Sequence, residues 1–245
     1  MTKTVKLYDV ATISTGNSAP QDEKLFKDGV HNFVRTSDVG QIRKGIIFEA
    51  RDKLNDKGIL KLRKFPKGTI LFPKSGASTF LNHRVMLGMD AYVSSHLATI
   101  KGDNTKVLDS YLLYILETID AANLVADSSY PSLKTQTISE IELVLPSILE
   151  QQHIVSKLDA AFTEIDKIIR TERRKIKDIK KFNSEFISEQ INKLSDTNPK
   201  KLSDISKLTR GPFGGSITKI MFVEQGYAIY EQKHAIRNNF ENIKY

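Results

Sequence analysis

The sequence contains no cysteine, so a disulfide framework and a thiolate metal site are both excluded. A chain without cysteine suits a reducing compartment, and we expect this one to act in the cytoplasm. No apolar run approaches the roughly 18 residues of a membrane-spanning helix. Residues 1–13 also lack the charged-then-apolar leader of an exported protein, so we expect a soluble chain with no membrane partner.

Motifs of catalysis are missing as well. The sequence lacks the Gly-x-x-x-x-Gly-Lys-Ser/Thr loop that holds ATP phosphates, and it lacks the Asn-Pro-Pro-aromatic motif of a methyltransferase. The glycine-rich stretch 211–215 has no lysine, which favours a turn. The five histidines are scattered, without the His-x-x-x-His spacing of a metal site. We therefore predict no catalytic residue, no metal and no cofactor.

Positive charge, by contrast, is in excess. The formal net charge is +8 and the sequence pI is about 9.4, which favours a polyanionic partner, most commonly a nucleic acid. Hydrophobic residues make up 40% of the chain, enough for a packed core rather than general disorder. A length of 245 residues allows one large domain or two smaller ones.

The longest feature is one amphipathic segment, residues 147–194, which contains no glycine or proline. Ser147 and Glu150 form a capping-box pattern, in which the hydroxyl accepts an amide at the helix start and the carboxylate reaches back. As one helix the segment would be about 70 Å long, more than the diameter of a domain of this size. Apolar residues at 3.5-residue spacing therefore predict a coiled coil with a partner helix, with an ordinary core helix of a bundle as the alternative.

Residues 2–146 predict a mixed domain with more strand than helix, so the fold class is α+β. One helix is expected over residues 110–125, with Asp109 as its cap and apolar residues at helical spacing. Short β-rich runs bounded by Gly, Pro, Asn or Asp predict the strands. These runs cover residues 5–13, 32–36, 45–48, 69–72, 91–93, 98–101 and 141–145.

The C-terminal segment repeats the start of the chain. After a polar linker, residues 201–211 align with residues 6–16, and Lys, Leu, Asp and Gly are identical at matching positions. The repeat predicts a tandem plan in which a second domain follows the helix. The second copy covers about 45 residues, which we expect to be too few for a core.

Several stretches resemble the specificity subunit of type I restriction–modification systems. Residues 145–154, Leu-Pro-Ser-Ile-Leu-Glu-Gln-Gln-His-Ile, are similar to the Pro and Glu-Gln-x-x-Ile helix start that follows a target-recognition domain in that family. Residues 74–76 and 94–98 resemble the family's Ser-Gly and His-x-Ala stretches, and residues 131–133 resemble its Pro-x-Leu turn. The layout is similar over the whole chain, while only the helix start is specific in sequence.

The resemblance implies a layout and a set of partners. Residues 1–146 would be a DNA-binding target-recognition domain, residues 147–195 a coiled-coil spacer and dimerisation helix, and residues 196–245 a linker with the incomplete start of a second recognition domain. The chain would select sites on double-stranded DNA for separate methyltransferase (M) and restriction (R) subunits, which themselves use S-adenosylmethionine and ATP. Because the second domain is a stub, two chains paired as a homodimer through their helices would supply one recognition domain each.

DNA recognition needs cations that neutralise phosphates and polar side chains that reach base edges. The loops of the first domain supply both, next to apolar strands that present them. The basic residues among 57–74 would contact phosphates, or alternatively form a solvated basic surface. Gly76 could permit a positive φ or a close approach of the backbone to DNA, or could simply form a turn. The predicted DNA-binding residues are Arg35, Thr36, Ser37, Lys61, Arg63, Lys64, Lys74, Ser75, Gly76, Ser78, Thr79, Asn82, Arg84, Lys134 and Thr135.

The long helix carries the predicted subunit contacts. A basic cluster over residues 170–181 indicates either a solvated flank or a contact with DNA or a partner. The alternative function is a non-enzymatic coiled-coil scaffold whose globular head binds another protein, and an active nuclease is a third hypothesis. The predicted subunit-contact residues are Glu150, Gln151, Ile154, Val155, Leu158, Phe162, Ile165, Ile169, Ile176 and Ile179.

Overall fold

The computed structural model describes residues 3–125, 132–193, 200–207, 209, 221–239, 243 and 244, without the side chain of Arg237. Pro131 of the predicted turn, the linker 194–199 and the glycine-rich stretch 211–215 lie outside the described residues. The chain divides into two compact units, Met1–Arg174 and Lys175–Tyr245, and each is described by itself. No helix among the described residues is long and apolar enough to cross a membrane.

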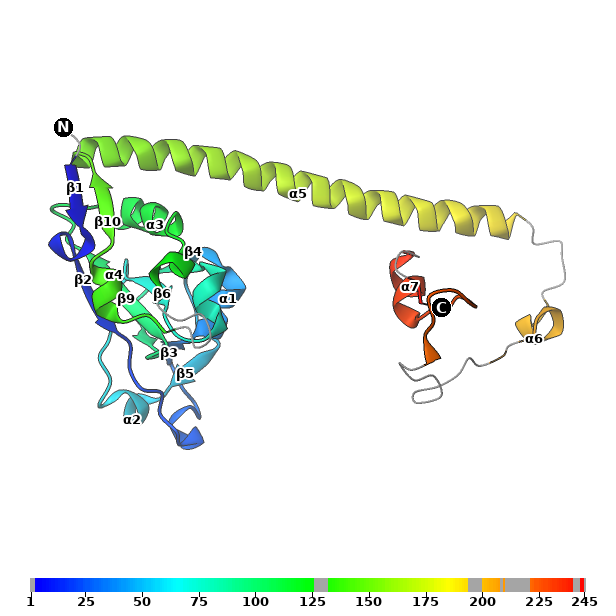
Figure 1. The fold of residues 1–245 in the computed structure, drawn as a ribbon, viewed down its shortest axis with the longest axis horizontal. Helices are drawn as coiled ribbons and strands as arrows, with labels where there is room; N and C mark the ends of the chain where they lie inside the picture. Colours follow the sequence, from blue (N-terminus) through cyan, green and yellow to red (C-terminus); the bar gives the residue numbers. More distant parts are fainter. Residues whose placement is uncertain are drawn as a thin grey trace. The chain divides into compact units, whose positions relative to one another are not determined.

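A five-stranded sheet forms the centre of the first unit (Figure 1). Neighbouring strands are antiparallel, except that the edge strand β4 runs parallel to β7. In spatial order the strands are β2 (Ala11–Thr15), β9 (Leu97–Gly102), β6 (Ile70–Pro73), β7 (Arg84–Leu87) and β4 (Lys44–Ile47).

Two smaller sheets complete the strands of this unit. The first has the order β5 (Asp52–Leu54), β3 (His31–Val34) and β8 (Tyr92–Val93). The second is a ribbon that joins the two ends of the domain, because β1 (Lys3–Lys6) pairs antiparallel with β10 (Glu142–Leu145). This ribbon leads directly into the long helix (Figure 1).

Short helices connect and cover the strands. The α-helices are α1 (Thr36–Ile42), α2 (Asp56–Ile59), α3 (Asp109–Glu117) and α4 (Thr135–Ser139). The 3₁₀ helices are η1 (Leu7–Asp9), η2 (Glu23–Leu25), η3 (Ala77–Leu81) and η4 (Ala121–Leu124).

The central strand β6 is buried on both faces and so divides the core in two. Side chains alternate across a strand, and accordingly Ile70 and Phe72 pack with Leu112 of α3 in one cluster. Leu71 faces the other cluster, together with Val85 and further aliphatic residues. A third, smaller cluster lies around Phe33 and Leu54. Burial on both faces explains why residues 70–72 form an unbroken apolar run in the sequence.

The strand predicted over residues 5–13 is wrong as one element, because the turn η1 divides it into β1 and β2. The backbone N–H of Lys6 donates to Asp9 Oδ2 at 3.0 Å, and the amide of Val10 donates to the carbonyl of Leu7. A short acidic side chain that accepts a nearby backbone N–H competes with the hydrogen bonds that would otherwise continue the strand. The turn places Leu7 in the core, fully buried.

The helix predicted over residues 110–125 is also too long. Asp109 is its first residue rather than its cap, and α3 ends at Glu117, where the Thr118 hydroxyl donates to the carbonyl of Ile115 at 2.7 Å. Asp120 then caps the separate turn η4. Two strands that were not predicted are present, β5 and β7.

The predicted long helix is confirmed as one element, α5 (Ile148–Asn192), of 45 residues. Its rise of 1.5 Å per residue gives a length of about 68 Å. At its start the Ser147 hydroxyl accepts the amide of Glu150 at 3.3 Å, which is the first half of the predicted capping box. The mixed α+β architecture with a long helix agrees with the predicted fold class.

In the second unit the described residues include α6 (Leu202–Ile205) and α7 (Gln232–Arg237). The backbone N–H of Lys201 donates to Asp204 Oδ2 at 3.3 Å, and a one-turn helix follows. The same bond joins the backbone N–H of Lys6 to Asp9, where a 3₁₀ helix follows instead, so the sequence repeat is accompanied by a repeated cap. The division into domains at residues 146 and 195 stays a prediction.

Candidate DNA interface

Several loops at the ends of the central strands contact one another directly. The Asn17 side chain joins the first two, since its Oδ1 accepts the Arg63 amide and its Nδ2 donates to the Arg63 carbonyl, both at 2.8 Å. The Arg63 guanidinium donates to the carbonyl of Thr15 at 2.6 Å. The carbonyl of Asn17 in turn accepts the amide of Ser95 at 2.7 Å.

The same network continues into the loops after β6 and before α4. The amide of Lys74 donates to the carbonyl of His96 at 3.1 Å, and the carbonyl of Lys74 accepts the amide of Leu133 at 2.8 Å. Ser75 and Ser132 form an isolated antiparallel bridge. These loops therefore form one connected region, which we name the strand-end surface. It comprises residues 15–17, 61–64, 74–78, 94–96 and 132–134.

Two glycines allow this arrangement. A Cβ on Gly16 would lie 2.2 Å from the carbonyl oxygen of Ser94, so only glycine permits the two loops to meet this closely. Gly76 has a φ of 71° and open space around its Cα, so of the predicted alternatives the positive φ is confirmed.

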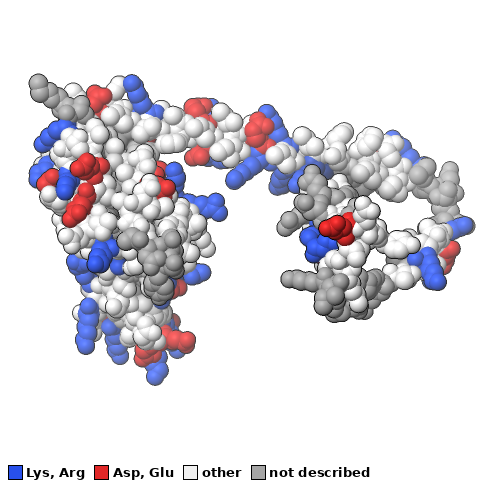
Figure 2. All heavy atoms as spheres, viewed as in Figure 1, with Lys and Arg blue, Asp and Glu red and all other residues white. Residues whose placement is uncertain are grey.

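The strand-end surface carries positive charge without matching acids. Its five segments contain no Asp or Glu. Lys61 and Lys134 are exposed, Lys74 is half-buried, and none of the three forms an ion pair with any described residue. Lys64 differs, because it lies 3.2 Å from Asp90. At the end of the first unit that carries α2, by contrast, Lys and Arg side chains lie together with Asp and Glu side chains (Figure 2).

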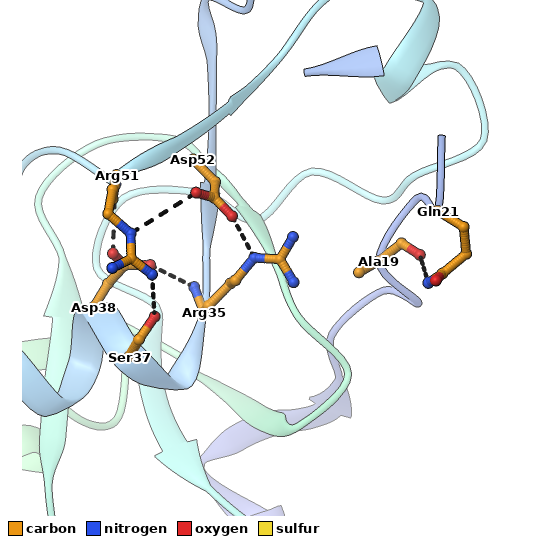
Figure 3. A network of polar contacts seen from close by, with 7 residues as sticks. All are labelled: Ala19, Gln21, Arg35, Ser37, Asp38, Arg51 and Asp52. Carbon is orange, nitrogen blue, oxygen red and sulfur yellow. Dashed lines mark hydrogen bonds and ion pairs between the residues drawn. The ribbon is translucent and has the colours of Figure 1, made fainter. Parts of the chain in front are cut away.

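The predicted residues Arg35, Thr36 and Ser37 lie elsewhere, beside an open groove of about 900 Å³. Arg35 Nε donates to Asp52 Oδ2 at 2.5 Å (Figure 3). The Ser37 hydroxyl contacts the Arg51 guanidinium at 3.2 Å. Thr36 is the half-buried first residue of α1.

Asp38 organises this groove although it was not predicted as a site residue. It is buried, and its two oxygens accept the backbone amides of Arg35 at 2.8 Å and of Arg51 at 3.3 Å. One carboxylate thus fixes the backbone of both arginines, which come from separate segments of the chain. The groove is the second candidate region for contact with DNA.

Arg84 is a correction to the predicted set, because its side chain is fully buried and cannot contact DNA here. Its guanidinium lies 3.4 Å from the centre of the Phe72 ring and donates to the carbonyl of His83 at 2.8 Å. Burial lowers the pKa of Arg84 to about 10, while nearby Glu117 and Asp120 act in the opposite direction. Arg84 is the first residue of strand β7, whereas the sequence analysis placed it among the loop residues.

Two neighbours of Arg84 also have structural roles. Thr79 is fully buried within η3, so it too is removed from the predicted DNA contacts. Asn82 donates to Asp120 Oδ1 and accepts the amide of Ala121, both at 2.8 Å, and so ties η3 to η4. Ser78 is half-buried, and its hydroxyl donates to the carbonyl of Ser75 at 3.0 Å. Thr135 is the half-buried first residue of α4.

Sequence reasoning missed five residues of these two regions: Asn17, Asp38, Arg51, Asp52 and His96. A signal for His96 was available, because residues 94–98 carry part of the family resemblance. No local pattern marks Asn17, whose partners lie 46 and 78 residues away along the chain.

Comparison with known families decides what this domain is. Residues 2–181 match the model of the type I restriction modification DNA specificity domain. The chain belongs to this family. Both the strand-end surface and the groove lie within the matched residues.

Comparisons with individual proteins agree with this family assignment. The chain is 27% identical over 164 residues to the type I restriction enzyme MjaIX specificity subunit of Methanocaldococcus jannaschii, a match that covers 62% of this chain and 36% of that protein. Among solved structures, the HsdS subunit from Thermoanaerobacter tengcongensis is similar with a TM-score of 0.54 at 17% identity, covering 69% of this chain and 39% of that one.

A second similar structure was solved to show the structural basis of complex assembly and conformational transition of the type I R-M system. Its TM-score is 0.60 at 16% identity, covering 74% of this chain and 43% of that one. At these identities the likeness shows the fold. The chain spans about two fifths of the length of the relatives it matches.

The base of helix α5 is attached to the specificity domain rather than free for a partner. Gln151, a predicted subunit contact, is fully buried, with Oε1 accepting the amide of Leu108 at 2.9 Å. Its Nε2 donates to the carbonyls of Lys106 and Pro146, each at 3.0 Å. Ile154 and Val155 likewise pack against the core of the same chain. Gln151 is therefore corrected to a contact within the chain, whereas Ile154 and Val155 are only half-buried, and their contact with a partner subunit stays a prediction.

Beyond this base the helix is exposed. Glu150 is exposed, and Leu158 is half-buried. Tyr114 of α3 donates to Asp159 and lies 5.7 Å from the Phe162 ring, which fixes one further turn of α5. The remaining predicted contacts Phe162, Ile165, Ile169, Ile176 and Ile179 are between 42% and 59% exposed.

Proposed function

We propose that this chain is the DNA-recognition subunit of a type I restriction–modification enzyme, and that it acts without catalytic activity of its own in the cytoplasm. It would direct separate methyltransferase and restriction subunits to a site on double-stranded DNA. The observation that carries the proposal is a specificity-family domain whose strand-end surface presents lysines without acidic partners among the described residues.

The charge of this surface favours DNA over a protein as the partner of the domain. A protein that neutralises phosphates with lysine or arginine releases condensed counterions, and this release supplies much of the affinity. Lysines already paired with acids would contribute less, because their charge is in part compensated. Lys61, Lys74 and Lys134 are therefore the predicted phosphate contacts, with the polar side chains of Ser75 and His96 and the backbone of Gly76 within the same surface.

Methylation in cells tests the proposal directly. The methyltransferase subunit would be expressed with and without this chain, and methylated positions would be mapped by methylome sequencing. We expect one discrete methylated motif that depends on the chain. Methylation at the same sites in its absence would contradict the proposal.

Salt dependence tests the strand-end surface itself. Each phosphate contact contributes about 0.9 to the slope of log K against log salt. Replacing Lys61, Lys74 and Lys134 together by alanine should therefore reduce the slope by about 3 in a binding assay with duplex DNA. The matched control replaces three exposed lysines outside the surface that likewise form no ion pair with a described residue, Lys3, Lys27 and Lys157, and should leave the slope unchanged. Binding that responds little to salt would instead indicate the scaffold function.

We further propose that the exposed seam of α5 pairs with another helix, as in a homodimer of this chain. A row of half-exposed Ile and Phe side chains is costly in water and is typical of one half of a coiled coil. The seam consists of Phe162, Ile165, Ile169, Ile176, Ile179 and Phe186, and each of these side chains is at least 42% exposed.

Sedimentation velocity tests the pairing. The chain should sediment as a dimer at micromolar concentration, and Ile169→Glu together with Ile176→Glu should convert it to a monomer. Thr163→Glu together with Thr171→Glu adds the same charge off the seam and serves as the control. A monomeric wild-type chain would refute the homodimer. It would leave the proposed DNA recognition unaffected, because that proposal does not depend on pairing of the helices.

A further inference from the structure

Arg35 is held in a fixed orientation from three sides. Its Nε donates to Asp52 Oδ2 at 2.5 Å, and its guanidinium lies 5.6 Å from the Phe26 ring centre and 5.2 Å from that of Phe33. An ion pair through Nε and stacking on aromatic rings restrict the rotation of the guanidinium plane. The backbone of Arg35 is fixed as well, by Asp38.

The two terminal amino groups of Arg35 are left free by this arrangement. Neither has a hydrogen-bond partner within the part of the chain that the structure describes. In Figure 3 they point away from Asp38 and Asp52, toward the segment that carries Ala19 and Gln21. All five of these residues line the groove of about 900 Å³, so the free donors face an open space.

The charge of the groove indicates which kind of acceptor would fit. Three cationic side chains line it, Arg35, Arg51 and Lys53, against four acidic ones, Glu23, Asp38, Glu49 and Asp52. A phosphate or a carboxylate would enter a region with a small excess of negative charge, which is unfavourable. A neutral group with two adjacent acceptors avoids this cost and matches the two donors of the guanidinium fork.

We propose that Arg35 reads a guanine of the target DNA, with its two terminal amino groups donating to O6 and N7 in the major groove. Guanine is the base that presents this pair of acceptors, and arginine is its commonest specific contact. Asp52 is a positioning residue that keeps the fork in place. The inference rests on the proposed DNA-recognition function and adds a specificity-determining residue to it.

Selection of binding sites from a random duplex library tests the proposal. The full chain in complex with its methyltransferase partner would be used as wild type, Arg35→Ala, Arg35→Lys and Lys3→Ala. We expect one guanine of the selected motif to lose its preference by about 5- to 150-fold in both Arg35 variants. The other positions should be retained. Lys3→Ala removes an exposed charge outside the groove and should select the wild-type motif.

A modified base then identifies the contact. Replacing that guanine by 7-deazaguanine removes the N7 acceptor, so it should weaken wild-type binding and leave Arg35→Ala binding unchanged. An Arg35→Ala motif identical to that of wild type would overturn the inference. A uniform loss of affinity over all sequences, with Arg35→Lys unaffected, would also overturn it, because it indicates a phosphate contact. If the wild-type complex selects no motif, the proposed function itself fails.

Discussion

Replacing Gln151 by leucine should loosen the attachment of helix α5 to the specificity domain. The side chain satisfies three backbone groups, the amide of Leu108 and the carbonyls of Lys106 and Pro146. A buried group left without a partner costs about 1–3 kcal/mol. Lys106 is exposed and Pro146 half-buried, so water can reach part of this site. We therefore expect a loss of about 2–5 kcal/mol in the free energy of unfolding.

Urea unfolding followed by circular dichroism measures this loss. The neighbouring Gln152 is exposed, and Gln152→Leu makes the same chemical change on the same turn of the helix. A surface substitution of this kind should stay within about 0.5 kcal/mol of wild type. Equal stability of the two variants would refute the role assigned to Gln151, and with it the attachment of the helix through a buried amide.

Four further variants test features of the fold, and thermal melting measures the stability of each. Burial raises the pKa of Tyr114, so the folded state keeps a proton that the unfolded state releases above pH of about 10. The stability that Tyr114 contributes is therefore present below that pH and lost above it, and Tyr114→Phe should decline less steeply in alkali than wild type. Gly16→Ala should cost about 1–3 kcal/mol by overpacking, whereas Gly40→Ala, with open space in α1, should stabilise by about 0.5–1 kcal/mol. Arg84→Ala should lose about 3 kcal/mol while selecting the wild-type DNA motif, and a changed motif would show that Arg84 reaches the DNA after all.

Sequence patterns predicted the parts of the fold that depend on local periodicity. The 45-residue helix and most strands fall close to their expected places, because apolar spacing and breaker residues are local signals. Errors occurred where a polar side chain bonds to nearby backbone. Asp9 interrupts an apolar run, and Thr118 ends a helix whose apolar spacing continues.

The candidate site was harder to predict, because its geometry depends on contacts between distant segments. Arg35 and Lys74 were identified from their place after strands, yet nothing in the sequence pairs Arg35 with Asp52 or Asn17 with Arg63. Arg84 shows the opposite error. An arginine in a polar stretch favours a surface position, and only the fold reveals the Phe72 ring beneath it.

The ribbon of β1 and β10 has a consequence for how such proteins can change. Lys6 and Glu142 are directly paired in this ribbon. The chain therefore leaves the ribbon after Lys6 and returns to it at Glu142, at points only about 5 Å apart. An insert whose own ends meet at that spacing could take the place of residues 7–141, provided that it also offers Gln151 the two backbone groups that Leu108 and Lys106 offer here. Under the proposed function, exchange of this cassette by recombination would alter the DNA site that is read in a single event, while the exposed seam of α5 is inherited unchanged.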